Sequence, residues 1–229
     1  MKWSTILTTL LVSALVFGQK KAQTFEVSDL SASDSPISFT GATKVLKTGT
    51  ACVVTAHNNS SKSLLAMVAT ADVTTRYERD QPVTFQYDGF FKETLIGPGL
   101  DFDVVDEGMY SAVEVRYVNG VPVEPPPPNF LCHANAKVLF IQFEDGSTWG
   151  DYQTGKDVMA RRTTTIAWLG HLVDAYDSGG EAAFAAALDE PESKRHQLKF
   201  EADYFKITVI DLVRKRLAAA QKRQASGIF

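Results

Sequence analysis

Signatures of catalysis are missing from this 229-residue sequence. It contains no G-x-S-x-G, H-E-x-x-H or C-x-x-C motif and no phosphate-binding G-x-x-x-x-G-K-[ST] loop. None of its four histidines has a second histidine at metal-binding spacing. These absences do not exclude an enzyme, because catalytic triads assemble from residues that are distant in sequence. They leave no positive reason to propose one, and no cofactor is expected.

Cysteine is scarce as well, since the chain has only Cys52 and Cys132. One pair cannot make a disulfide-rich scaffold, so the fold must depend on an apolar core. In an oxidising compartment, two cysteines suggest a single disulfide. The alternative is two separate thiols, with Cys52 in a buried strand and Cys132 in a loop, and the sequence alone leaves both open.

A strong positive charge and a bilayer-spanning run are also absent. The net formal charge is −4, which argues against nucleic-acid binding, because phosphate contacts need clustered Lys and Arg. The uncharged apolar run from Ile6 to Phe17 is shorter than the roughly 20 residues that cross a bilayer. Lys2 precedes this run and Gly18 follows it, which is the order of a secretory signal peptide. We expect residues 1–18 to be removed on export to the periplasm or exterior, leaving no stable membrane anchor; an uncleaved anchor is the alternative.

Short β-branched and aromatic runs, separated by turn signals, occupy the chain from residue 25 to about residue 150. This rhythm predicts an antiparallel, immunoglobulin-like β-sandwich over residues 19–150, with a β-barrel as the alternative. The apolar run 137–143 is predicted to be a central strand.

Two hairpins are predicted from turn chemistry. Asn119-Gly120 supplies the two positive-φ residues of a two-residue turn between valine-rich strands. The cluster Asn-Asn-Ser-Ser at 58–61 predicts a hairpin that pairs residues 51–57 with 63–73.

After Trp149 the apolar period changes from two to 3.6, which predicts a helical tail of about three helices over residues 151–229. The fold class is therefore α+β. Thr154 and Asp157 resemble a capping box at the start of the tail. The run Ser-Gly-Gly at 178–180 is expected to end its first helix.

Residues 198–212 fit two structures. Alternation of Leu198, Phe200 and Tyr204 with charged residues is typical of a strand. The spacing of Leu198, Ala202, Phe205, Val209 and Leu212 gives a helical stripe. The absence of Gly and Pro from this region favours the helix.

An acidic cluster is the candidate metal site. It consists of Asp101, Asp103, Asp106 and Glu107, and calcium prefers several oxygen ligands from one loop. The spacing does not match an EF-hand, and Asp101 and Asp103 also fit the solvent face of a strand.

A second candidate site surrounds Trp149. Asp145 and Asp151 could serve acid–base chemistry or bind a sugar beside this aromatic residue. The simpler interpretation is that Asp145-Gly146 forms a turn and that Trp149 packs between the strands and the helices.

The stretch FEDGSTWGD at 143–151, preceded by the strand pattern and followed by the helical tail, resembles a loose group of uncharacterised exported bacterial proteins. The likeness is strongest between about Lys137 and Ala187. It implies this architecture and a bacterial origin, and that group has no established activity to carry over.

The leading hypothesis is a non-enzymatic exported module for binding or assembly. Its apolar helical stripes need a partner surface, because isolated short helices are marginal in water. That surface could be the strand domain, another protein or a second copy of the chain. The alternatives are a secreted carboxylate-dependent hydrolase and a calcium-stabilised adhesion module.

Overall fold

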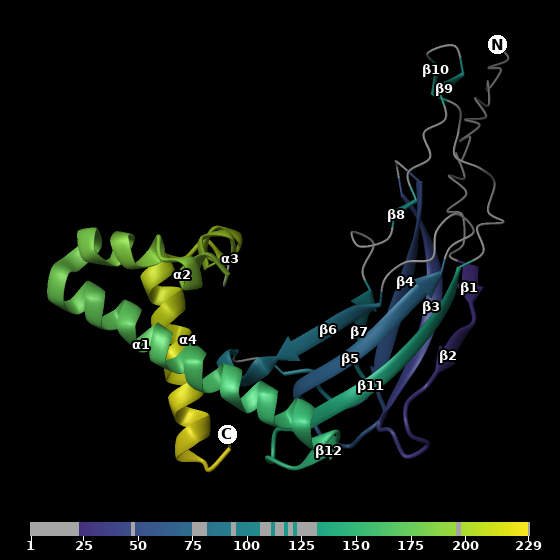
Figure 1. Ribbon diagram of the computed structural model, residues 1–229, viewed down its shortest axis with the longest axis horizontal. Coiled ribbons are helices and arrows are strands. Elements are labelled where there is room, and N and C mark those ends of the chain that lie inside the picture. The colour runs from purple at the N-terminus through teal and green to yellow at the C-terminus, as the bar shows by residue number, and fades with distance from the viewer. Residues whose placement is uncertain are drawn as a thin grey trace, which may run out of the picture.

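The fold is α+β, with strands up to Gly150 and helices from Tyr152 onward. Figure 1 shows the strands on one side of the molecule and the helices on the other. The expected signal peptide, residues 1–18, lies outside the described residues. The computed structural model describes residues 23–46, 49–74, 82–92, 95–105, 111–112, 117–118, 121–122, 132–195 and 198–228.

The described strands form two larger sheets and a two-stranded ribbon. The first sheet has the order β1-β3-β4-β7, with β8 also paired to β4. The second has the order β12-β11-β5-β6, with β2 paired parallel to β11, and β9 pairs with β10. Among the described residues the two sheets stay separate, so the barrel alternative does not hold there. The bounds are β1 (Gln23–Phe25), β2 (Val27–Asp29), β3 (Ile37–Leu46), β4 (Gly49–Asn58), β5 (Leu64–Thr74), β6 (Val83–Asp88), β7 (Asp101–Val105), β8 (Ser111–Ala112), β9 (Tyr117–Val118), β10 (Val121–Pro122), β11 (His133–Phe143) and β12 (Thr148–Gly150).

Two strand predictions are confirmed. β11 contains the apolar run 137–143 and lies between β5 and β12 in the second sheet. β9 and β10 pair antiparallel with Val118 opposite Val121, the register of a two-residue hairpin. The turn residues Asn119 and Gly120 themselves lie outside the described residues.

The predicted hairpin between residues 51–57 and 63–73 is wrong. β4 belongs to the first sheet and β5 to the second, so the segment between them crosses from one sheet to the other. β4 instead forms its hairpin with β3. Turn chemistry identified a change of chain direction but not the strand that would be paired.

The side chain of Asn58, which is fully buried, organises this crossing. Its Nδ2 donates to the carbonyl oxygens of Lys62 at 2.9 Å and Gly97 at 3.0 Å. Its Oδ1 accepts from the backbone amide of Ser60 at 3.1 Å and from the hydroxyl of Ser60 at 2.7 Å. One side chain therefore holds together two loops that are distant in sequence.

One apolar core fills the space between the two sheets. Residues of β3, β4 and β7 enter it from one side, and residues of β5 and β11 enter it from the other. A disulfide between Cys52 and Cys132 lies within this core. Of the two states that the sequence left open, the structure has the disulfide, which connects β4 to the residue before β11.

β11 changes its inward face at a bulge. Val138 faces the core between the sheets, but after the register shift between Val138 and Phe140 the inward position is taken by Ile141. An extra residue in one strand exchanges the two faces, because side chains alternate along a strand. Phe140 and Gln142 therefore point to the opposite side, where the helices pack.

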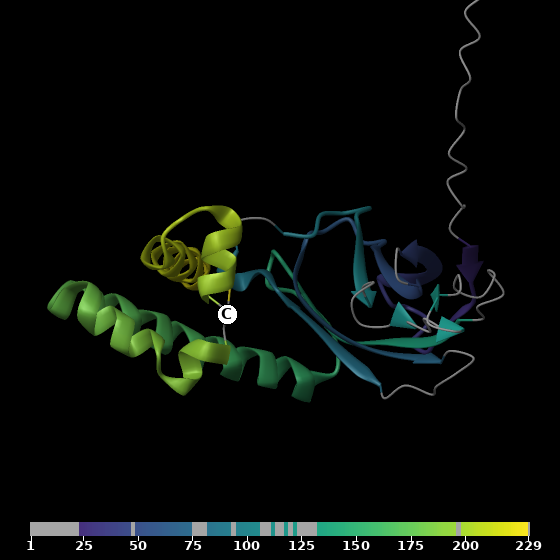
Figure 2. The same cartoon turned by 90° about the horizontal axis from the view of Figure 1, so that it is seen from above.

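The helical region extends from the edge of the second sheet. α1 begins beside this sheet and runs away from it, and α4 returns across α1 and beside α3 (Figures 1 and 2). A second core, which includes Leu169, Leu172 and Val213, lies between the helices. The bounds are η1 (Gly89–Phe91, a 3₁₀ turn after β6), α1 (Tyr152–Leu188), α2 (Pro191–Arg195), α3 (Leu198–Phe205) and α4 (Val209–Ala225).

The ends of α1 differ in part from the prediction. The capping residue is Asp151, whose carboxylate accepts from the backbone amide of Thr154 at 2.7 Å, so Thr154 and Asp157 are not the box. The predicted end of the first helix at 178–180 is confirmed, because Gly180 has φ 63° and ψ −156° and this kink separates two helical segments within α1.

Residues 198–212 are helical, so the strand alternative is wrong. They do not form one helix, however. Lys206 adopts φ 54° and ends α3. Thr208 then starts α4 by accepting a hydrogen bond from the amide of Asp211 at 3.3 Å.

Candidate binding groove

The acidic residues proposed for calcium are used within the first sheet. Asp101 contacts Nδ1 of His57 at 2.5 Å, and Asp103 accepts from the hydroxyl of Thr55 at 2.8 Å. Asp106 and Glu107 lie outside the described residues. Among the residues that the structure describes, no group of three His, Cys, Asp or Glu side chains is placed to hold a metal ion.

Asp145 belongs to a turn. It pairs with Nζ of Lys62 at 2.6 Å and accepts from the hydroxyl of Ser147 at 2.5 Å. Hydrogen bonds from Lys62 and Ser147 hold the pKa of Asp145 well below its usual range.

Asp151 caps α1. The backbone and hydroxyl hydrogen bonds from Thr154 lower the pKa of Asp151. Trp149 is half-buried and packs against the core between the sheets. A shallow hollow beside Trp149 and Asp151 does not include Asp145 among its lining residues. The two carboxylates therefore have separate local roles, and neither has the raised pKa of a general acid at neutral pH.

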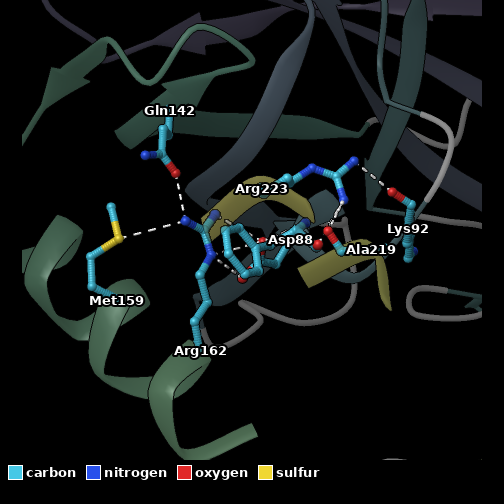
Figure 3. Close-up of polar contacts among 8 residues, drawn as sticks. Asp88, Lys92, Gln142, Met159, Arg162, Ala219 and Arg223 are labelled. Carbon is cyan, nitrogen blue, oxygen red and sulfur yellow. Dashed lines mark hydrogen bonds and ion pairs between the residues drawn. The ribbon is translucent and has the colours of Figure 1, made fainter. Parts of the chain in front are cut away.

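Arg162 occupies the junction between the second sheet and α1, and its side chain is fully buried (Figure 3). It donates from Nε and Nη2 to the carboxylate of Asp88, each at 2.9 Å, and from Nη1 to the amide oxygen of Gln142 at 2.6 Å. Its guanidinium also lies over the ring of Phe90, 4.5 Å from the centroid. Its charge is paired with Asp88 and its donors make hydrogen bonds, so the role of Arg162 is structural: it holds α1 against the second sheet.

A second arginine attaches α4 to the same junction. Arg223 donates to the carbonyl oxygens of Phe90 at 2.7 Å and Lys92 at 2.6 Å (Figure 3). Burial lowers the pKa of Arg223. This contact fixes η1 against α4 and so forms one wall of the groove described next.

A groove of about 630 Å³ opens between η1, α3 and the start of α4. Aromatic side chains make up much of its lining, and three of them, Phe200, Tyr204 and Phe205, are 69%, 73% and 58% exposed. The rings of Tyr204 and Phe205 meet edge to face at 5.1 Å. The lining residues are Phe91, Lys92, Phe200, Glu201, Tyr204, Phe205, Ile207, Leu212, Lys215 and Arg216.

A neighbouring hollow of about 460 Å³ continues along α4. It shares Lys92 and Lys215 with the first, so the two form one extended surface, which we call the α3–α4 groove. Basic residues dominate this second part. Its lining residues are Lys92, Lys215, Ala218, Ala219, Lys222, Arg223, Ser226 and Ile228.

The sequence pattern did not predict the α3–α4 groove. Phe200 and Tyr204 were relevant there only to the choice between a helix and a strand. Their spacing of four places both on one side of a helix, opposite to the buried side. An apolar pair on the outer side of a helix is the signal that could have indicated a binding surface.

Comparison with protein-family models, curated proteins and solved structures finds no match to this chain. No helix in the described part of the chain is both long and apolar enough to cross a membrane.

Proposed function

We propose that this chain is an exported, non-enzymatic binding protein. An immunoglobulin-like sandwich made by the two sheets serves as the scaffold, and the helices carry the binding surface. The face-to-face sheets and the disulfide between them support the sandwich. The signal-like residues 1–18 and the resemblance to exported bacterial proteins support export.

The α3–α4 groove is the observation that carries this proposal. The described residues include six large hydrophobic side chains that are exposed, and three of the six line this one groove. Scattered exposed hydrophobic residues are ordinary, but a cluster around a hollow is typical of an interaction site. Aromatic residues also contribute the most to binding when a partner buries them.

A neutral apolar dye such as Nile red tests the groove directly. We expect saturable fluorescence enhancement with the exported protein. The double variant Phe200→Ser, Tyr204→Ser should bind about tenfold more weakly, since truncating an aromatic contact residue costs on the order of 1–2 kcal/mol. Tyr152→Ser is the matched control, because Tyr152 is 75% exposed and does not line the groove. Equal dye binding by the double variant and the wild type would refute the proposal.

Export is tested separately. The mass and N-terminal sequence of the protein recovered outside the cytoplasm should correspond to a chain that begins at Gln19. Retention of the whole chain in the cytoplasm would contradict this part of the proposal without affecting the groove.

A further inference from the structure

We infer that the α3–α4 groove binds an acidic, amphipathic polypeptide segment of a partner protein. This inference rests on the proposed function and specifies its ligand. It is carried by the charge of the groove, by its length and by the order of its apolar and basic parts.

The charge of the groove is positive. Three basic residues line its aromatic part, and the acidic residue there, Glu201, is hydrogen-bonded to Arg216. The second part adds Lys222 and Arg223. Residues 198–228 contain seven basic and three acidic side chains, a formal charge of +4 in a chain whose total is −4. Such a local excess attracts anionic partners and steers their approach.

The groove is longer than a small molecule requires. Its lining residues extend along α4 from Leu212 to the C-terminal cap, Ser226, and most have another lining residue three or four positions away, so they lie along one side of the helix. At 1.5 Å per residue, this side is about 21 Å long. That length equals about 14 residues of a helical ligand, which favours the mode in which an amphipathic helix lies in a groove.

The concave shape argues for a polypeptide over a membrane surface. The exposed aromatic side chains surround a hollow between three elements, whereas a bilayer contacts a flat or convex face. The order of the two parts also orients the ligand. Its apolar side chains would meet Phe200 and Tyr204, and its carboxylates would meet Lys92, Lys215 and Lys222.

Two synthetic 14-residue peptides test the inference with the full mature protein. Both carry Leu and Phe along one side of a helix; the other side carries Glu in one peptide and Lys in its twin. We expect fluorescence anisotropy to show binding of the acidic peptide at least about tenfold tighter than binding of the basic twin. This preference should weaken at high salt, which screens exposed charges.

Charge reversal provides the matched variants. Lys92→Glu with Lys215→Glu should abolish or reverse the preference between the two peptides. Lys156→Glu is the control, since Lys156 is exposed at the start of α1 and does not line the groove. Thermal melting of each variant shows that it is folded, and Phe200→Ser with Tyr204→Ser should weaken binding of the acidic peptide.

The outcomes separate this inference from the proposed function. Equal binding of both peptides, or undiminished binding by the Phe200, Tyr204 variant, would overturn the acidic ligand while Nile red binding still supported the groove. If neither peptide binds to a protein that does bind Nile red, the polypeptide ligand is overturned. A further outcome is that the wild type sediments with phosphatidylglycerol vesicles while the Lys92→Glu, Lys215→Glu variant does not. That result would overturn the polypeptide ligand in favour of a lipid surface. If the wild type binds neither the peptides nor Nile red, the proposed function itself is refuted.

Discussion

Arg162 and Asp88, 74 residues apart in sequence, form a two-pronged ion pair in which the arginine side chain is fully buried. Asp88 is the last residue of β6 and also caps η1, and Arg162 lies on α1. The pair therefore joins a sheet edge, a 3₁₀ turn and a helix at one point. A guanidinium suits this position because its planar fork can meet a carboxylate, an amide oxygen and an aromatic face together.

We expect Arg162→Met to lower the free energy of unfolding by about 3–5 kcal/mol, because Asp88 and Gln142 would lose their hydrogen bonds from the buried guanidinium. Urea unfolding measures this change. Arg161→Met is the control, since the neighbouring Arg161 is exposed. Asp88→Asn combined with Arg162→Met should cost less than the sum of the single variants, because the two residues interact directly. If the losses of unfolding free energy in the two single variants simply add up in the double variant, the two side chains do not stabilise the fold as a pair.

The crossing between the sheets depends on Asn58. Asn58→Ala should destabilise the protein by about 1–3 kcal/mol, because it removes the fully buried amide that bonds Ser60, Lys62 and Gly97. Asn59→Ala is the matched control, since Asn59 is exposed and donates to the hydroxyl of Ser38. Thermal unfolding of the two variants should differ clearly, and equal melting temperatures would refute the role given to Asn58.

The disulfide connects two sheets across a sequence separation of 80 residues. The double variant Cys52→Ala, Cys132→Ala should unfold with about 2–4 kcal/mol less free energy, largely because the unfolded chain is no longer constrained. Reductant should lower the stability of the wild type and leave the double variant unchanged. A thiol assay that finds two free thiols in the exported protein would contradict this prediction.

Stability should depend on pH through Asp145. The pKa of Asp145 is lower in the folded protein than the ordinary value of about 4, so its ionisation stabilises the fold above that pH. Asp145→Asn should therefore lower the melting temperature at pH 7. The difference from the wild type should shrink gradually as the pH falls below about 4, because the unfolded chain then binds a proton at Asp145 that the folded protein takes up only at a lower pH. Asp174→Asn, at an exposed position on α1, controls for the change of charge; a difference that is constant with pH would exclude this mechanism.

Local patterns in the sequence were enough to predict several elements of the fold. The apolar run 137–143 indicated a central strand, Asn119-Gly120 indicated a hairpin, and the helical stripe from Leu198 indicated a helix. Each of these depends on residues close together in the chain, where strand alternation, turn geometry and helix periodicity apply directly. The break at Lys206 was missed because no Gly or Pro marks it.

Pairings between distant residues could not be read in this way. Nothing near Asn58 indicates that the chain there changes sheets, and nothing near Arg162 indicates Asp88 as its partner. The same holds for the groove, because Phe200 and Tyr204 form a site only where η1 and α4 supply the opposite wall.

The sequence by itself determined the class of the fold, the order of strands before helices and the presence of a signal-like N-terminal run, since composition and period carry these properties. Only the tertiary structure decided that the cysteines are bonded, that the candidate carboxylates serve a turn and a helix cap, and that aromatic and basic side chains share one groove. Those outcomes depend on which distant segments pack together, and that is set by burial of the whole core rather than by any local stretch.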